Sequence, residues 1–234
     1  GYDLKNEPDI DYNYQDSTLV NQWLEFVIAK ARSYDSVRPM TIGWSNADKA
    51  LNFKDKLDFL SFHFYKSPKL LKEDLLFLKK NAPEKKVVVS EYGKSTYLSK
   101  IFPFGNSKNS LFKALLSVHS ALEDNHIPAY FWTLYDFKEV ASDVAGKMPW
   151  QKNPQKFFGI IDVDGKPKDA MKIFEHKAAT FKPSLIDRIP PFVLTYLFLG
   201  AVFVLIIIYF KKLKQFFIYL INTRFKGLKD FFKK

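Results

Sequence analysis

The sequence contains no cysteine among its 234 residues. Disulfides, a thiolate nucleophile and cysteine-ligated zinc are therefore excluded. The histidines are few and stand singly, without the spacing of a metal site. They are His63, His119, His126 and His176. A Gly-rich phosphate loop is also lacking, which counts against a nucleotide-binding sheet. These patterns imply no metal and no organic cofactor.

The charge is concentrated at one end of the chain. Hydrophobic residues make up 47% and charged residues 26%, a composition that excludes intrinsic disorder and supports a sizeable core. Of the formal net charge of +11, residues 211–234 contribute +7, from eight basic side chains and one acidic one. Because the basicity belongs mostly to this tail, it does not indicate a nucleic-acid face on the rest of the chain.

A long uncharged run precedes the basic tail. Residues 192–210 carry no charged side chain, and as a helix they would span about 28 Å, close to the hydrocarbon thickness of a bilayer. The run predicts a single transmembrane helix over 192–210, after a linker at 186–191; a buried core helix is the alternative. Lys211, Lys212 and Lys214 follow at once, and basic flanks mark the cytoplasmic side. We therefore expect a single-pass protein of the cell membrane, with residues 1–185 extracytoplasmic and the C-terminus cytoplasmic.

The tail itself, residues 211–234, alternates apolar and basic side chains. This pattern is typical of an amphipathic helix lying on an anionic inner leaflet, and a partly disordered basic tail is the alternative. At the other end, the chain begins with Gly1 and shows no export signal. Since an external domain needs one, we expect the sequence to be a fragment whose N-terminal part is missing.

The extracytoplasmic part alternates predicted strands and helices. Short apolar runs such as Val87–Val89 are typical of strands buried on both faces of a parallel sheet. Strands are expected at 1–5, 40–45, 57–64, 86–91 and 128–134. Helices are expected at 17–36, 47–54, 68–81, 107–125 and 168–181, with a long loop before the last. Repeated strand–helix units predict either a doubly wound sheet or a (β/α)8 barrel.

Polar residues follow the strands at their carboxyl ends, which favours the barrel. Asn6-Glu7-Pro8 ends the first strand, His63-Phe64-Tyr65 the third, Glu91-Tyr92-Gly93 the fourth, and Trp132 and Thr133 lie at the fifth. In a barrel these ends converge on one mouth, where active sites are built. Asn-Glu-Pro alone, or a strand-end Glu alone, would be weak evidence for a site. Here both occur at strand ends, with two strand–helix units between them, and this combination supports a catalytic pair of carboxyls.

With these motifs in place, the chain resembles the retaining clan A glycoside hydrolases, most closely glycoside hydrolase family 5, the cellulase and mannanase family. In that family Asn-Glu-Pro closes strand four and the nucleophile Glu closes strand seven. The segments Asp58–Tyr65, Phe131-Trp132 and Gly159–Lys168 resemble its strand six, its strand eight and the approach to its last helix. The resemblance covers about residues 1–182.

The resemblance implies roles for six residues. Glu7 would be the acid/base and Glu91 the nucleophile, since retaining hydrolysis needs two carboxyls about 5 Å apart with one proton between them. The remaining four would be substrate-binding residues: Asn6 at the sugar 2-hydroxyl, His63 and Tyr65 on one strand face, with Tyr65 holding Glu91, and Trp132 stacking on a sugar ring. Trp44 and Trp150 are weaker candidates for stacking.

By this mapping the chain is a partial (β/α)8 TIM barrel. Residues 1–185 would run from about the end of strand four to helix eight, and the transmembrane helix would follow. A fragment of this kind would leave a strand edge unpaired.

The expected function is a membrane-tethered retaining glycoside hydrolase that cleaves a β-linked glucan or mannan by double displacement. Its expected partners are a polysaccharide or oligosaccharide substrate and, through residues 192–210, the bilayer; no nucleic acid is expected. A membrane-anchored carbohydrate-binding protein on a non-catalytic barrel is the alternative, because a fold does not fix a function.

Overall fold

The computed structural model describes residues 1–97, 107–189 and 191–231. The chain divides into two compact units. Gly1–Tyr97 and Lys108–Pro183 form the first, and Leu98–Ser107 and Ser184–Lys234 form the second.

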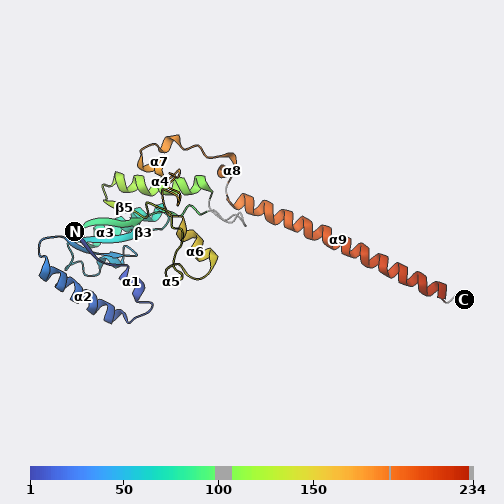
Figure 1. Cartoon of the computed structure of the whole chain (residues 1–234), viewed down its shortest axis with the longest axis horizontal. Helices are drawn as coiled ribbons and strands as arrows, with labels where there is room; N and C mark the ends of the chain where they lie inside the picture. The colour runs from blue at the N-terminus through green and yellow to red at the C-terminus, as the bar shows by residue number, and fades with distance from the viewer. Residues whose placement is uncertain (98–106, 190, 232–234) are drawn as a thin grey trace. The chain divides into compact units, whose positions relative to one another are not determined.

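The first unit is built on a five-stranded parallel sheet with the strands in sequence order (Figure 1). The strands are β1 (Tyr2–Asn6), β2 (Met40–Trp44), β3 (Phe59–Phe64), β4 (Lys86–Tyr92) and β5 (Ala129–Phe131). The crossovers carry α1 (Pro8–Asp11), α2 (Ser17–Tyr34), the 3-10 turn η1 (Lys49–Leu51), α3 (Pro68–Asn81) and α4 (Lys108–Asp124). The repeated strand–helix pattern predicted from the sequence is thus confirmed, and the sheet curls into half a barrel with α2 and α4 flanking it in Figure 1.

Helix α2 shows how the sequence directs these crossovers. Asp16 caps its start, because the Asp16 carboxylate accepts a hydrogen bond from the Thr18 backbone N–H at 2.7 Å. One face of the helix then buries Val20, Leu24 and Ile28, spaced four residues apart, against the sheet. Helix α3 begins with a proline, whose missing N–H costs nothing in the first turn.

The central strands are buried on both faces, but the two faces differ in chemistry. On β3, Leu60, Phe62 and Phe64 join the hydrophobic core beneath the helices. The alternate positions Ser61 and His63 are also buried and point to the opposite, concave face, because side chains alternate along a strand. A buried polar face on the inside of the curl is where the predicted site residues lie.

The two outer strands are the edges of the sheet among the described residues. Tyr2 on β1 is 40% exposed and Tyr130 on β5 is 68% exposed, in contrast to the buried side chains of β2. Each edge therefore leaves backbone donors and acceptors available to a further strand, as expected for part of a barrel.

The segment after β5 departs from the prediction. The expected long loop contains α5 (Ser142–Ala145) and α6 (Pro149–Lys156). The expected helix 168–181 is wrong as a single element: it is divided into α7 (Met171–Phe174) and the 3-10 turn η2 (Ala178–Thr180). The break has a local cause, since His176 adopts a left-handed φ of 54° and the Lys177 N–H bonds back to the Lys172 carbonyl at 2.7 Å, the closure that ends many helices.

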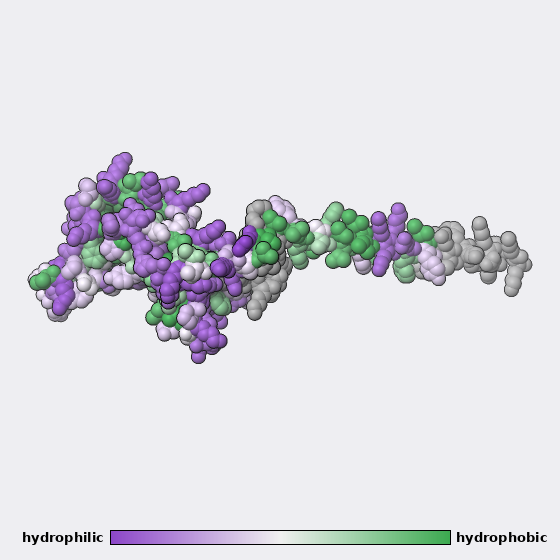
Figure 2. All heavy atoms as spheres, turned by 90° about the horizontal axis from the view of Figure 1, so that it is seen from above, coloured by the Kyte–Doolittle hydropathy of each residue, from purple (hydrophilic) through white to green (hydrophobic). Residues whose placement is uncertain are grey.

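The second unit contains α8 (Leu185–Arg188) and one continuous helix, α9 (Pro191–Phe231). The predicted division between a membrane helix and a separate tail helix does not appear in the backbone, because no proline interrupts the sequence after Pro191. Within α9, Tyr196–Phe216 has a mean hydropathy of 2.0, and Figure 2 shows mostly hydrophobic atoms along the helix, interrupted by one hydrophilic group. Among the described residues it is the one helix that could cross a membrane by length and composition alone. The predicted amphipathic face beyond residue 219 lies outside the described side chains.

Candidate active site

Glu7 lies at the junction of β1 and α1, in an uncommon backbone conformation. Its φ and ψ are 44° and 54°, in the left-handed region that few residues other than glycine adopt. Backbone hydrogen bonds on both sides hold it there: the Glu7 N–H donates to the Gly43 carbonyl at 2.7 Å, and the Glu7 carbonyl accepts from the Ile10 N–H at 3.0 Å. Such strain in a well-held residue often marks a functional position.

Asp9 fastens this turn to the neighbouring strand. Its carboxylate accepts a hydrogen bond from the Ser45 backbone N–H at 3.1 Å and a second one from the Ser45 hydroxyl. Since Ser45 follows directly after β2, the start of α1 is tied to the carboxyl end of β2. Glu7 is therefore held on the same sheet edge as the other strand ends.

Glu91 lies near the end of β4, where a register shift brings it opposite His63 on β3. The Tyr65 hydroxyl donates to Oε2 of Glu91 at 2.6 Å. Burial raises the pKa of Tyr65 far above its ordinary value, and its hydrogen bond to Glu91 and the nearby carboxylates raise it further. Tyr65 therefore remains a proton donor to Glu91 across the working pH range.

His63 lies between the two glutamates. Its Nδ1 is 2.7 Å from Oε1 of Glu7 and 3.4 Å from Oε2 of Glu91, and its side chain is only 1% exposed. The contacting atoms of all three residues lie within 4.8 Å of one another. The sequence prediction that placed Glu7 and Glu91 at strand ends 84 residues apart thus corresponds to two carboxyls that converge in space.

The same three groups have a spacing that a divalent cation could bridge. The direct contact of 2.7 Å between His63 Nδ1 and Glu7 Oε1 is also the length of a hydrogen bond between the two side chains. Acid–base chemistry on a substrate bond is what such a carboxyl–imidazole–carboxyl cluster can perform without any further group.

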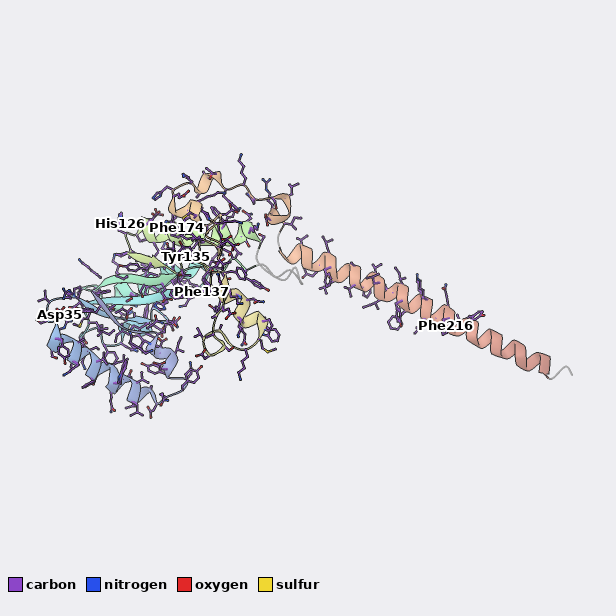
Figure 3. The ribbon with its side chains drawn as sticks, viewed as in Figure 1. Asp35, His126, Tyr135, Phe137, Phe174 and Phe216 are labelled. Carbon is purple, nitrogen blue, oxygen red and sulfur yellow. The ribbon has the colours of Figure 1, made fainter. Side chains whose placement is uncertain are left out.

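The two remaining predicted binding residues lie at the rim. Asn6 is exposed at the end of β1, directly before Glu7. Trp132 follows β5, is 40% exposed and has its ring 6.0 Å from that of Phe137, which Figure 3 labels. The Trp132 N–H donates to the Tyr92 carbonyl at 2.8 Å, and the peptide bond after Trp132 is cis. Trp132 is thus anchored to the residue after Glu91 while its ring remains accessible.

The two weaker stacking candidates, Trp44 and Trp150, differ in their exposure to solvent. Trp44 is completely buried, and its ring stacks on Phe53 at 6.4 Å, so the suggestion that it stacks on sugar is wrong. It belongs to the core because it is the last residue of β2 on the face covered by helices. Trp150, in contrast, is 68% exposed on α6.

Sequence reasoning missed a set of contacts around Asp136 and Phe158, here called the clamp, that packs against Tyr65. Phe158 packs edge-on against Tyr65, with ring centroids 5.8 Å apart. The next residue, Gly159, donates its N–H to Asp136 at 2.8 Å, and the Lys168 ammonium lies 2.8 Å from the same carboxylate oxygen. Asp136 is 4% exposed, so this pair is nearly buried. The only sequence signal was an acidic residue soon after the Trp132 strand.

The fold can now be compared with known proteins. No family model matches the chain, and no curated protein matches it in sequence. Solved structures do match. The GH2 β-galacturonidase from Eisenbergiella tayi bound to galacturonate superposes with a TM-score of 0.55 at 16% identity, over 70% of this chain and 31% of that one.

Two β-glucuronidases give similar values. The enzyme from Ruminococcus gnavus in complex with D-glucuronic acid has a TM-score of 0.54 at 17% identity, over 75% of this chain and 32% of that one. The enzyme from Bacteroides uniformis has 0.51 at 19% identity, over 74% and 22%. The chain shares its fold with glycoside hydrolases. It spans between about a fifth and a third of these proteins, and the narrower resemblance to family 5 finds no support among them.

Proposed function

We propose that this chain carries the two catalytic carboxyls of a retaining glycoside hydrolase that acts on a β-linked glycan. One observation carries the proposal: Glu7 and Glu91, from β1 and β4, both contact Nδ1 of His63 and lie within 4.8 Å at their contacting atoms. Retaining enzymes need their carboxyls about 5 Å apart, whereas inverting enzymes need a wider gap to admit water. The shared fold with glycoside hydrolases supports the same reading.

In the first step, Glu7 gives its proton to the glycosidic oxygen while an oxygen of Glu91 attacks the anomeric carbon. The carbon–oxygen bond breaks, the alcohol leaves, and the sugar remains as an ester on Glu91. In the second step, Glu7 takes a proton from water as the water oxygen attacks the anomeric carbon. The sugar is released with its original configuration, Glu91 is again a carboxylate and Glu7 is again protonated.

The surrounding residues suit these two steps. Tyr65, kept protonated, donates to the ionised form of Glu91 and aims it. We assign Asn6 to the sugar 2-hydroxyl, a hydrogen bond that strengthens in the transition state, and Trp132 to stacking on the apolar face of a sugar ring. Both residues lie at the exposed rim beside the two carboxyls' strands.

The sugar is proposed to be glucose or mannose in a β-linked glucan or mannan, on the motifs in the sequence. The solved structures of similar fold act on glucuronides and galacturonides, so a carboxylated sugar is the alternative class. A panel of dinitrophenyl β-glucoside, β-mannoside, β-glucuronide and β-galacturonide separates them. Turnover of the uronides alone would overturn the glucan or mannan assignment while keeping the retaining hydrolase.

The decisive experiment assigns the two carboxyls by azide rescue. Full-length protein is assayed with the best dinitrophenyl glycoside, alongside Glu91→Ala, Glu7→Ala and the matched surface control Glu25→Ala, whose half-exposed carboxylate forms an ion pair with Lys56. We expect both site variants to lose hydrolysis and the control to keep it. Azide should rescue Glu91→Ala to the α-glycosyl azide and Glu7→Ala to the β-glycosyl azide. Equal rates in all four proteins would remove both residues from the mechanism.

A non-catalytic carbohydrate-binding protein on the same fold is the second candidate. It predicts saturable binding of oligosaccharide to wild-type protein with no turnover of any member of the panel. Binding that survives Glu91→Ala unchanged, together with absent hydrolysis, would favour this candidate over the enzyme.

We further propose that α9 tethers the protein to a membrane. Its support is the uncharged stretch at residues 196–210 of the candidate span, followed at once by Lys211, Lys212 and Lys214. Wild-type protein should remain in the membrane pellet after alkaline carbonate washing. Leu205→Lys places a charge at the middle of the segment, which costs about 3 kcal/mol of insertion, and should release a large fraction. Full release of the wild type by carbonate would contradict the tether.

A further inference from the structure

Glu7 and Glu91 bring two carboxylates together at the proposed catalytic site. Their side chains are 23% and 21% exposed, and the contacting atoms of Glu7, Glu91 and His63 all lie within 4.8 Å of one another. Among the described residues, neither carboxylate forms an ion pair with a lysine or an arginine. Two negative charges at this separation repel each other, so a positive partner that binds between them lowers the free energy of the site.

His63 adds a nitrogen ligand from the interior of the fold. Its side chain is 1% exposed, and its Nδ1 lies 2.7 Å from Oε1 of Glu7 and 3.4 Å from Oε2 of Glu91. The imidazole closes the cluster on its buried side, while the partly exposed carboxylates leave it accessible to an ion from solvent. Histidine spacing in the sequence predicts no metal site here, because the ligands come from β1, β3 and β4 and meet only after folding.

The ligand types and their spacing favour zinc over the harder cations. Tetrahedral zinc holds its ligands at about 2.0–2.2 Å, which places neighbouring ligand atoms about 3.3 Å apart. The separation of 3.4 Å between His63 Nδ1 and Glu91 Oε2 already fits, and the contact of 2.7 Å to Glu7 has to open by about 0.6 Å. Magnesium and calcium take six or more ligands, nearly all oxygens, so a cluster of one nitrogen and two carboxylates suits them poorly.

Tyr65 supports one of the three ligands from outside the cluster. Its hydroxyl donates to Oε2 of Glu91 at 2.6 Å, and its own ring packs edge-on against Phe158, with centroids 5.8 Å apart. Outer groups of this kind fix the orientation of metal-binding side chains. The Glu91 carboxylate is therefore held near His63 without an ion, which reduces the entropy lost when one binds.

We propose that Glu7, His63 and Glu91 form a reversible zinc site, at which Zn²⁺ and the glycan substrate exclude each other. Three protein ligands leave a fourth position for water. With the ion bound, Glu7 carries no proton to donate and the Glu91 carboxylate is not free to attack the anomeric carbon, so zinc acts as an inhibitor. The inference rests on the proposed function for its effect on hydrolysis, whereas the binding of zinc does not depend on that function.

Isothermal titration calorimetry measures the site without any substrate. Full-length protein without a histidine tag is kept in detergent, freed of metal with EDTA and titrated with zinc chloride. We expect one strong site per chain in the wild type. His63→Gln, Glu7→Gln and Glu91→Gln should each lower the affinity at least about tenfold, since the loss of even an outer partner of a metal ligand costs about 10- to 100-fold. Magnesium chloride at the same concentrations should give no binding curve.

His119→Gln is the matched control. Among the described residues, His119 is the other histidine that lies close to a carboxylate, with its Nε2 3.4 Å from Oε1 of Glu123. Its removal should leave zinc affinity unchanged. Circular dichroism verifies that each variant is folded, and the two partly exposed glutamates keep the test if the buried His63→Gln does not fold. Absent zinc binding in the wild type, equal affinity for magnesium, or full affinity in the folded site variants would overturn the inference.

Hydrolysis provides the second readout. In the wild type and in His119→Gln, zinc should raise KM for the best dinitrophenyl glycoside and leave kcat unchanged, because ion and substrate compete for the same carboxyls; EDTA should restore KM. Zinc that binds without raising KM, or that accelerates hydrolysis, would overturn the inference. A wild type that binds zinc and hydrolyses no glycoside would sink the proposed function alone. An active wild type that binds no zinc would sink the inference alone.

Discussion

The hydroxyl of Tyr65 donates a hydrogen bond of 2.6 Å to Oε2 of Glu91. The donor comes from the residue after β3 and the acceptor from β4, so the contact crosses the sheet exactly where a register shift brings Glu91 into line with His63. Tyr65 thus links the position of the proposed nucleophile to the shape of the sheet edge.

Removing that hydroxyl should weaken catalysis without removing any carboxyl. A hydrogen bond to a charged group contributes about 1.5–3 kcal/mol, so Tyr65→Phe should lower kcat/KM about 10- to 100-fold. Tyr14→Phe, which alters a tyrosine that is 78% exposed, is the control. A kcat/KM for Tyr65→Phe equal to that of the wild type would contradict the assigned role.

Trp132 should contribute to substrate binding. Its ring is accessible while its backbone is anchored to Tyr92, so Trp132→Ala removes a fixed stacking surface. Aromatic stacking contributes about 1 kcal/mol, and KM for an oligosaccharide should rise about five- to tenfold. Trp23→Ala, on the exposed face of α2, should leave KM unchanged. Steady-state kinetics would count against the platform if both variants behaved alike.

The clamp behind the site should contribute strongly to stability. Lys168→Met removes the ammonium partner of the nearly buried Asp136 carboxylate, which keeps its hydrogen bond from the Gly159 N–H. Breaking one side of such a pair should lower the free energy of unfolding by about 3 kcal/mol. Lys172→Met breaks a surface pair with Asp169, in which both side chains are at least one third exposed, and should cost less than about 1 kcal/mol. Urea unfolding, monitored by tryptophan fluorescence, measures the free energy of unfolding of both variants. Equal losses in the two variants would show that the Asp136–Lys168 pair stabilises the fold no more than a surface ion pair does.

His119 should make the fold sensitive to mild acid. Its Nδ1 lies at a hydrogen-bond distance of 2.7 Å from the Tyr92 hydroxyl, and its ring packs against Phe174, which Figure 3 labels. Burial lowers the pKa of His119 below the ordinary value of 6.5. The unfolded chain therefore binds a proton at higher pH than the folded one. The stabilising contribution is complete above pH 6.5 and is lost as the pH falls through the lower folded value.

The corresponding experiment compares thermal unfolding midpoints between pH 7.5 and 5. The wild-type midpoint should fall across this range, and the fall should be smaller in His119→Gln. His126→Asn is the control, because that histidine is exposed and asparagine tolerates its left-handed φ of 52°. Parallel curves for the wild type and His119→Gln would remove His119 as the source of the acid sensitivity.

Local pattern was enough to predict most of the first unit. The apolar runs and the helical spacing on α2 placed the strands and helices within a few residues. Strands buried on both faces are continuously apolar, whereas a helix with one buried face repeats its apolar residues every three or four positions, so the two patterns are distinct. Polar residues at successive strand ends also predicted which side chains would meet, since parallel strands deliver their carboxyl ends to one edge.

What failed depended on contacts between distant residues. The break after Phe174 arises from a left-handed histidine that helical periodicity does not reveal. Trp44 was ambiguous because its place in the core depends on the curl of the sheet. Asp3 gave only a faint signal, an acidic residue inside a strand; its carboxylate accepts a hydrogen bond from the Gly43 N–H at 2.9 Å, a contact between strands that local pattern does not reveal.

The left-handed backbone of Glu7 couples its proposed catalytic role to folding stability at one position. A side chain other than glycine held there costs about 1–2 kcal/mol, so Glu7→Gly would relax the main chain while removing the carboxyl. If Glu7 has the proposed role, a selection for heat-resistant variants of this protein would therefore favour inactive ones at position 7. Directed evolution of the scaffold should screen turnover and thermal tolerance together.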